Sequence, residues 1–404
     1  MQQDFKDIMK DVRFLVGDVD RLESIKYVPV KTMFDEHIVE FLGALSKEIM
    51  HMPEAKAFSD VMSYAFWIRR QSITKVQERY TGREKIGRGV AFHIAPSNVA
   101  VNFAVSFTSA LLAGNPCVVR VSNKEFEQVS IITRAINKIL DNGYQDIKKY
   151  LVIIRYEHNR AITDWLSSIC DIRIVWGGNR TLYEVRESAL PPRAIELAFP
   201  DRHSLAIINS DEYMKRDAKK IADLFYIDTY FTDQNACSSP RLLVWMGTNI
   251  EEAKERFYGQ LAKKLEADYE MAPILAIDKW NAFCEYAAIH GGVTQQGTDN
   301  VLMRVKLDRI SADMMDYKMG GGYFFEYTTE CLDDLVPVLG KACQTISYLG
   351  IEPKQIYDIV KKYGVRGVDR IVPIGHTMDL TFIWDGYDMI DTMSRYIDIH
   401  QYLG

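Results

Sequence analysis

The strongest constraint on the fold of this chain is an alternation of short apolar runs with helical segments, which begins near residue 89. Four runs have the length and β-branched content of buried strands: GVAFHIA (89–95), PCVVRVS (116–122), LVIIRY (151–156) and IRIVWGG (172–178). The segments between them have the length and periodicity of helices: residues 99–113, 125–140 and 160–168. This strand–helix–strand order predicts a parallel sheet with right-handed crossovers.

A second alternating block follows residue 200. Its strand-like runs are SLAIINS (204–210), RLLVWMG (241–247), VLMRVKL (301–307), YFFEYT (323–328), RIVPIG (370–375) and LTFIWDG (380–386). Helices are predicted over residues 214–225 and 251–269, and ahead of the first block over residues 33–77, where they would cover a sheet. The sequence therefore predicts an α/β protein with two doubly wound lobes joined near residue 200, followed by a C-terminal segment.

Composition limits the classes of protein that fit this pattern. In 404 residues, 49 Lys and Arg face 55 Asp and Glu, which gives a net charge of −6 and excludes a broad nucleic-acid surface. The first ten residues, MQQDFKDIMK, lack the apolar core of a secretion signal, and the apolar stretch 99–113 is too short to span a membrane. A cytoplasmic protein with no membrane span is expected.

Cysteine spacing separates one thiol from the rest. None of the six cysteines forms a CxxC or zinc-type pattern, so no metal site and no disulfide scaffold is expected. Cys237 stands in the polar turn DQNACSSPR (233–241), where a thiolate is accessible to a substrate, whereas the others fall in helical or strand-like runs such as WNAFCEYAA and are expected to pack as small apolar residues. Cys237 is therefore either a nucleophile or an ordinary turn residue.

Two turns at predicted strand ends carry further candidates. Pro96 and Asn98 follow the first strand, where Asn98 either donates its amide to a developing oxyanion or caps the following helix. A dinucleotide G-x-G-x-x-G loop is absent, but Gly177, Gly178 and Asn179 link an apolar strand to a helix. Backbone N–H groups there either receive a pyrophosphate or form a plain turn.

Taken together, these stretches resemble a known superfamily. IAPSNVAVNFAVSFTSALLAGNPCVVRVSNK (94–124), IVWGGNRTL (174–182), IELAFPDRHSLAII (195–208) and DQNACSSPR follow the order of the aldehyde dehydrogenases. In detail they look like the acyl-CoA reductase branch, the LuxC-like fatty acyl-CoA reductases, from about residue 87 to the C-terminus. The resemblance implies an aldehyde dehydrogenase-like fold: N-terminal helices with a dinucleotide-binding domain (1–200), a catalytic domain (201–375) and a C-terminal segment (376–404). That last segment is expected either to close the second lobe or to form an oligomer interface.

The resemblance also implies roles for individual residues. Cys237 becomes the nucleophile, and Asn98 shares the oxyanion with the backbone N–H of Cys237. Pro96 and the Gly177-Gly178-Asn179 turn lie on the cofactor side, the turn against its pyrophosphate. Ser97 stands where aldehyde-oxidising relatives commonly have Trp.

Cofactor choice follows from the strand that ends at Arg120, the basic position expected at the adenosine ribose. NAD-preferring relatives place Glu three residues later, where this chain has Asn123 followed by Lys124. A neutral residue between two cations tolerates a 2′-phosphate, so NADPH is favoured, with NADH as the alternative.

Glu196 occupies the position of the water-activating Glu in oxidising relatives, but the glycines that follow that Glu are missing here. It is a general base, a proton relay or a structural carboxylate. His203 is either an acid or a satisfied histidine.

The expected reaction is NADPH-dependent reduction of an acyl-CoA or acyl-protein thioester to the aldehyde through an acyl-Cys237 intermediate. Alternatives are aldehyde oxidation to an acid or CoA ester, and a silent acyl- or dinucleotide-binding subunit. The resemblance further implies a homo-oligomer and an acyl-protein synthetase as partner.

Overall fold

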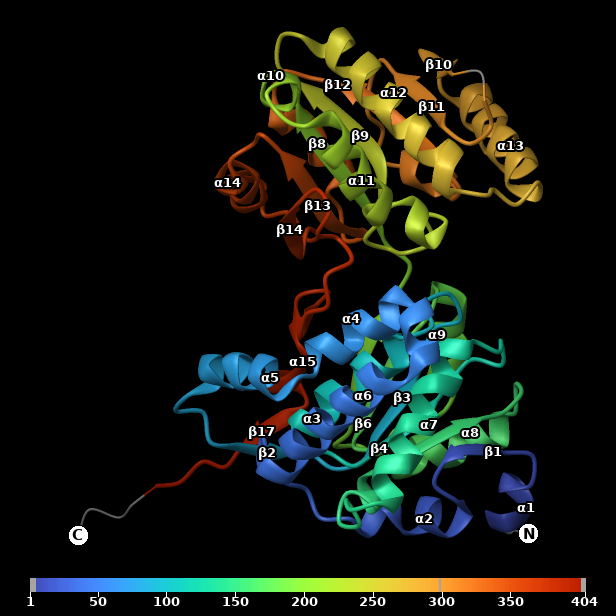
Figure 1. Ribbon diagram of the computed structural model, residues 1–404, viewed down its shortest axis with the longest axis vertical. Coiled ribbons are helices and arrows are strands. Elements are labelled where there is room, and N and C mark those ends of the chain that lie inside the picture. The colour runs from blue at the N-terminus through green and yellow to red at the C-terminus, as the bar shows by residue number, and fades with distance from the viewer. Residues whose placement is uncertain (1–4, 298, 401–404) are drawn as a thin grey trace. The chain divides into compact units, whose positions relative to one another are not determined.

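The computed structural model describes residues 5–297 and 299–400 (Figure 1). Their contacts form two compact units. Unit 1 extends to Pro200 and resumes at Leu380, and unit 2 comprises Asp201–Asp379.

The sheet of unit 1 has the order β1-β5-β4-β3-β6-β7, in which every neighbouring pair is parallel except β1 with β5. Its strands are β1 (Arg13–Val16), β3 (Ala91–Ile94), β4 (Cys117–Arg120), β5 (Leu151–Arg155), β6 (Ile172–Trp176) and β7 (Ile195–Phe199). The four strands predicted in the first block are confirmed, whereas β1 and β7 were not predicted. The chain places β4 and β5 on one side of β3 and then crosses back to place β6 and β7 on the other side. The strand order therefore reverses between β3 and β6, and α/β sheets bind ligands at such a reversal.

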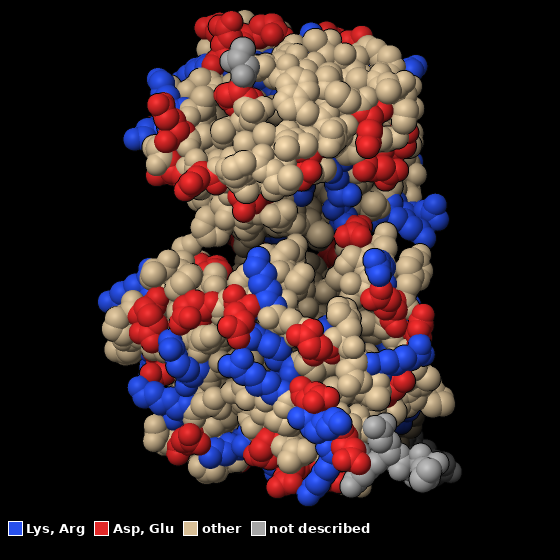
Figure 2. All heavy atoms as spheres, turned by 90° about the vertical axis from the view of Figure 1, so that its right-hand side faces the viewer, with Lys and Arg blue, Asp and Glu red and all other residues tan. Residues whose placement is uncertain are grey.

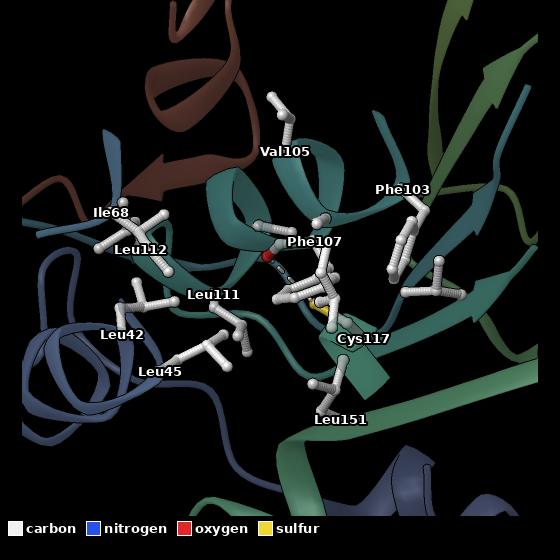
Figure 3. Close-up of a cluster of buried hydrophobic side chains, with 14 of the residues drawn as sticks. Leu42, Leu45, Ile68, Phe103, Val105, Phe107, Leu111, Leu112, Cys117 and Leu151 are labelled. Atoms are coloured by element: carbon white, nitrogen blue, oxygen red, sulfur yellow. Dashed lines mark hydrogen bonds between the residues drawn. The ribbon is translucent and has the colours of Figure 1, made fainter. Parts of the chain in front are cut away.

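Helices cover both faces of this sheet. They are α1 (Phe5–Met9), α2 (Val19–Ser24), α3 (Glu36–His51), α4 (Ser59–Trp67), α5 (Arg70–Gln77), α6 (Asn102–Leu112), α7 (Glu127–Asp141), α8 (Arg160–Ile169) and α9 (Asn179–Arg186). The predicted helices in residues 33–77 are confirmed. Phe103, Phe107 and Leu111 of α6 lie in one apolar cluster with Leu45 of α3 and Cys117 of β4 (Figure 3). α6 is buried over residues 103–112, and its sequence is accordingly mostly apolar.

The C-terminal segment packs on unit 1, so the expectation that it closes the second lobe is wrong. β17 (Ser394–Tyr396) pairs antiparallel with β2 (Lys85–Gly87), and Lys85 binds the Asp391 carboxylate at 3.0 Å. The segment also contains α15 (Met389–Thr392) and the hairpin of β15 (Ile383–Trp384) with β16 (Tyr387–Asp388). Of the predicted strand 380–386, only β15 forms.

The sheet of unit 2 has the order β10-β11-β12-β9-β8-β13-β14 and is parallel except for the edge strand β10. Its strands are β8 (His203–Asn209), β9 (Pro240–Met246), β10 (Val293–Gln296), β11 (Met303–Leu307), β12 (Tyr323–Thr328), β13 (Cys343–Leu349) and β14 (Arg370–Pro373). The helices are α10 (Ser210–Met214), α11 (Ala218–Asp228), α12 (Ile250–Asp268), α13 (Ile274–Ile289) and α14 (Pro353–Tyr363). Five of the strands predicted in this block, those between residues 204 and 375, are confirmed, whereas β10 and β13 were missed.

One predicted helix of unit 2, over residues 214–225, is wrong in detail. The segment is divided between α10 and α11 because Asp217 caps a new helix, its carboxylate accepting from the backbone N–H of Lys220 at 3.1 Å.

Lys and Arg are interspersed with Asp and Glu on the face drawn in Figure 2. Among residues 5–297 and 299–400, every helix is too short or too polar to traverse a lipid bilayer.

Candidate active site

The loop that carries Cys237 connects α11 to β9 and is held by a buried glutamine. Gln234 donates from Nε2 to the carbonyl oxygens of Pro240 (2.8 Å) and Tyr323 (3.1 Å). Its Oε1 accepts from the backbone N–H groups of Gly322 (3.0 Å) and Tyr323 (3.1 Å). Asp233 and Gln234 both have left-handed backbones, with φ of 50° and 59°. These hydrogen bonds offset the cost of that strained turn and join it to the ends of β9 and β12.

Arg241 places a buried cation beside the same loop. Its guanidinium donates to the carbonyl oxygens of Gln234 and Met319. Burial lowers the pKa of Arg241 to about 10, and the negative charge of Cys237 acts in the opposite direction. Arg241 therefore remains charged at neutral pH, and by the same interaction it stabilises a Cys237 thiolate.

The backbone of Cys237 is fixed from the neighbouring strand β8. Its carbonyl oxygen accepts from the Ser204 hydroxyl at 2.7 Å, and Ser204 in turn accepts from the backbone N–H of Thr345 at 3.1 Å. The thiol-bearing residue is partly exposed. A rigid backbone with an accessible side chain is the arrangement that a nucleophile requires.

The other cysteines divide into two groups. Cys117, Cys170 and Cys343 are buried as predicted, and burial raises the pKa of Cys170 and of Cys343 to about 12. Cys284 and Cys331 are exposed, so the expectation that they pack as small apolar residues is wrong for both. Cys284 lies on the outward side of α13, opposite the buried Ala282 and Tyr286.

A buried carboxylate near the loop was not found from the sequence. Asp228, at the end of α11, accepts from the backbone N–H groups of Gly375 (2.7 Å) and Thr377 (3.0 Å) and from the Thr377 hydroxyl (2.9 Å). Burial raises the pKa of Asp228 to about 6. The turn that Asp228 holds leads directly to Met378, whose sulfur accepts from the Ser238 hydroxyl at 3.5 Å.

In unit 1, Pro96 and Asn98 follow β3 at the carboxyl edge of the sheet, and Asn98 is exposed. α6 begins at Asn102 with Val101 at the N-cap, so the alternative that Asn98 caps this helix is wrong. Asn98 is thus on an exposed turn three residues before the N-cap.

The Gly177-Gly178-Asn179 turn also has the predicted form. β6 ends at Trp176, Gly178 is the N-cap of α9, and Asn179 is its first residue. A Cβ atom on Gly177 would lie 3.0 Å from the Thr181 side chain, so the close approach of strand end and helix favours glycine.

Arg120 ends β4 with an incompletely satisfied guanidinium. Its Nη2 donates to the Tyr156 carbonyl at 3.3 Å and the group lies 4.8 Å from the centre of the Tyr156 ring, but its buried Nε has no hydrogen-bond partner among the described residues. A buried donor of this kind fits an anionic ligand at the sheet edge. In the loop after Arg120, Asn123 donates from Nδ2 to Glu157 at 2.9 Å, and the Lys124 ammonium lies over the Phe126 ring.

Glu196 lies on β7, where both of its oxygens are engaged. Oε2 accepts from Arg173 Nη2 at 2.6 Å and Oε1 from Arg186 Nε at 2.7 Å, and the Arg173 side chain is 3% exposed. Of the three roles expected for Glu196, this geometry favours the structural one.

His203 is buried, and its Nε2 lies 3.0 Å from the Val338 carbonyl oxygen. Burial lowers the pKa of His203 to about 4, which corresponds to a satisfied, neutral histidine.

The predicted residues are thus distributed over both units: Cys237 lies in unit 2, whereas Asn98, Arg120, Gly177 and Glu196 lie in unit 1. Within the described ranges, no three His, Cys, Asp or Glu side chains form a group that could hold a metal ion.

Comparison with known proteins identifies both a family and a fold. Residues 3–293 match the family described as acyl-CoA reductase (LuxC). Long-chain acyl-protein thioester reductases are similar to this chain: that of Photobacterium phosphoreum is 24% identical over 188 residues (46% of this chain, 36% of the relative). That of Vibrio harveyi is 24% identical over 298 residues (71% of this chain, 59% of the relative). The matched stretch therefore spans about a third to three fifths of these relatives' length.

Solved structures show the fold. A NAD-dependent aldehyde dehydrogenase from Sinorhizobium meliloti superposes with a TM-score of 0.67 at 13% identity, covering 95% of this chain and 86% of that one. A 1-pyrroline-5-carboxylate dehydrogenase from Thermus, solved with bound NAD, gives a TM-score of 0.62 at 10% identity, covering 93% and 82%. The predicted aldehyde dehydrogenase-like α/β fold is confirmed.

Proposed function

Because the chain belongs to the acyl-CoA reductase (LuxC) family, we propose that it reduces an acyl thioester to an aldehyde through a covalent acyl group on Cys237. The observation that carries the proposal is the Cys237 turn itself. Its carbonyl is fixed by Ser204, its loop is held by Gln234, and the cation of Arg241 favours the thiolate. Unit 1 then serves as the dinucleotide-binding domain and unit 2 as the domain of the nucleophile.

In the first half-reaction, the Cys237 thiolate attacks the carbonyl carbon of an acyl-CoA or acyl-protein thioester. The new carbon–sulfur bond forms to Cys237, and the bond to the donor sulfur breaks as that thiol leaves. We assign the Asn98 amide and the backbone N–H of Cys237 to the oxyanion that develops between these events. Asn98 lies on an exposed turn before the N-cap of α6, which supports this assignment.

The residues of the unit 1 sheet edge fit a nicotinamide dinucleotide, with NADPH favoured and NADH as the alternative. Arg120 offers a buried donor to an anionic group, and Asn123 and Lys124 follow it. Pro96 and the N-terminus of α9 at Gly177, Gly178 and Asn179 would border the nicotinamide and pyrophosphate parts. When bound, the reduced nicotinamide supplies the hydride that converts the acyl group to an aldehyde.

Glu196 bears on the direction of the reaction. An aldehyde oxidiser needs a carboxylate that activates water on the acyl-enzyme, but both Glu196 oxygens are held by Arg173 and Arg186. We therefore propose that this chain keeps the acyl group on Cys237 from hydrolysis and works as a reductase. A homo-oligomer in the cytoplasm, supplied by an acyl-protein synthetase, remains part of the proposal.

Mass spectrometry of the full chain mixed with acyl-CoA, without a dinucleotide, tests the covalent step. We expect an acyl adduct on the peptide that contains Cys237, its loss in Cys237→Ala, and its retention in Cys284→Ala, the matched control for an exposed thiol. Addition of NADPH then releases aldehyde, and Asn98→Ala slows adduct formation by roughly 10²- to 10³-fold. Adduct at the same rate in Cys237→Ala, or release of free acid as the main product, contradicts the proposal.

A further inference from the structure

A side-chain hydrogen bond joins two loops at the carboxyl edge of the unit 1 sheet. β4 and β5 are parallel neighbours, with Arg120 opposite Ile154 in register. The loop after β4 carries Asn123 and the loop after β5 carries Glu157, and Asn123 Nδ2 donates to Glu157 Oε2 at 2.9 Å. Glu157 thus brings a carboxylate from the loop after β5 to Asn123 in the loop after β4, whose own side chain is a neutral amide.

The charge of Glu157 is not neutralised as that of its neighbour is. Glu125, in the same loop as Asn123, binds both Arg13 and Arg155 at 3.1 Å. Among the described residues, Glu157 forms no ion pair, and its hydrogen-bond partner is the uncharged Asn123. The exposed Glu157 side chain therefore presents a full negative charge beside the end of β4.

The order of the strands indicates which part of a dinucleotide would lie near the Glu157 carboxylate. In doubly wound sheets, the loop after the strand that neighbours the first strand contacts the adenosine ribose of a bound dinucleotide. A carboxylate in this loop accepts from the 2′-hydroxyl, whereas a cation accommodates a 2′-phosphate. Here β3, β4 and β5 occupy those first three positions, so Arg120, Lys124 and Glu157 follow the strand ends where such a ribose would bind. The two cations favour a 2′-phosphate and the carboxylate opposes it.

Resting on the proposed dinucleotide site, we propose that Glu157, oriented by Asn123, is the residue that discriminates between NADH and NADPH. Its carboxylate accepts from the ribose hydroxyls of the unphosphorylated cofactor and repels the 2′-phosphate. Glu157 thereby limits the NADPH preference that Arg120 and Lys124 create.

The test is calorimetric binding of NADP⁺ and NAD⁺ to the full chain without acyl substrate. Glu157→Gln removes the charge but keeps an oxygen that accepts from Asn123. We expect it to tighten NADP⁺ binding roughly fivefold to tenfold and to leave NAD⁺ binding equal or weaker. Glu330→Gln, which changes an exposed carboxylate in unit 2, should leave the ratio of the two affinities unchanged. The difference between wild type and Glu157→Gln should shrink as salt is raised, because exposed charges are screened.

The outcomes separate this inference from the proposed function. If wild type binds a dinucleotide but Glu157→Gln leaves the affinity ratio unchanged, the role of Glu157 is wrong and the cofactor proposal stands. If wild type binds neither dinucleotide, the cofactor proposal itself fails, and the assignment of Glu157 fails with it.

Discussion

The hydroxyl of Ser204 donates a 2.7 Å hydrogen bond to the carbonyl oxygen of Cys237. Ser204 is fully buried on β8, whereas Cys237 is partly exposed on the loop that precedes β9. Because the same Ser204 oxygen accepts from Thr345 on β13, one side chain connects the Cys237 turn to two strands of the sheet. The position of the proposed nucleophile therefore depends on the core of unit 2.

Replacing Ser204 with Ala should loosen this connection. The change removes the hydrogen bonds of Ser204 to the Cys237 carbonyl and to the Thr345 N–H, which costs about 1–3 kcal/mol of unfolding free energy and slows alkylation of Cys237. Urea unfolding and iodoacetamide labelling followed by mass spectrometry measure the two effects. Ser46→Ala is the matched control, because buried Ser46 donates to Ala65 in unit 1 at 2.6 Å. Equal labelling rates in the two variants would show that Ser204 does not position Cys237.

Arg241 should have separable effects on charge and structure. Arg241→Lys keeps the cation but loses the two-pronged contact with Gln234 and Met319, so it lowers stability while preserving the pH dependence of Cys237 alkylation. Arg241→Met removes the cation as well and shifts the alkylation profile to higher pH. Alkylation rates from pH 6 to pH 10 give the comparison. If the Met variant has the same profile as the Lys variant, the charge of Arg241 does not act on the thiolate.

Glu196→Gln should behave as a structural variant. Arg173, buried beneath Glu196, loses a charged partner, and we expect a loss of about 3 kcal/mol in the unfolding free energy of unit 1. The rate at which folded protein acquires an acyl group on Cys237 should not change. Chemical unfolding and adduct formation are measured on the same preparation. Unchanged stability combined with loss of turnover would instead identify Glu196 as a base.

Asp228 should give unit 2 a pH-dependent stability. Burial raises its pKa from the ordinary 3.8 to about 6 in the folded state, so between pH 6 and pH 4 the folded state binds the proton more tightly than the unfolded state does. The contribution of Asp228 to the unfolding free energy therefore rises as the pH falls through this window, by at most about 3 kcal/mol.

The measurement for Asp228 is the difference in unfolding free energy between wild type and Asp228→Asn at pH 4.5 and at pH 7. His203, whose pKa is lowered to about 4, titrates in the same window with the opposite effect, and the subtraction removes its contribution. A difference that is the same at both pH values would show that the carboxyl group of Asp228 does not take up a proton in this range.

Local sequence was sufficient for most of the central strands and for the separation of Cys237 from the packed cysteines Cys117, Cys170 and Cys343. Parallel strands buried on both faces read as continuous apolar runs, which is why β3 to β6 and β8, β9 were visible. β7 and β13 were missed because polar residues interrupt their apolar pattern: Glu196 in β7 pairs with Arg173, and Gln344, Thr345 and Ser347 are buried in β13.

The residues around Cys237 show the limit of such reasoning. Gln234 and Arg241 hold the loop and Asp228 holds the neighbouring turn at residues 375–377, yet only the run DQNACSSPR suggested that the Cys237 turn was unusual. Each of them acts through partners distant in sequence: Gln234 through Tyr323, Arg241 through Met319, and Asp228 through Thr377. Nothing in a linear pattern indicates which backbone groups a buried side chain will meet.

By itself the sequence determined the alternating α/β architecture, the position of the Cys237 turn and the Gly177-Gly178 strand end, because these depend on periodicity and on residue types a few positions apart. The tertiary structure decided that the C-terminal segment returns to unit 1, that both Glu196 oxygens are occupied and that Glu157 meets Asn123. The physical reason is the separation along the chain between the residues that interact. Burial, ion pairing and carboxylate placement depend on strands that become neighbours only when the sheet forms, and their order in space differs from their order along the chain.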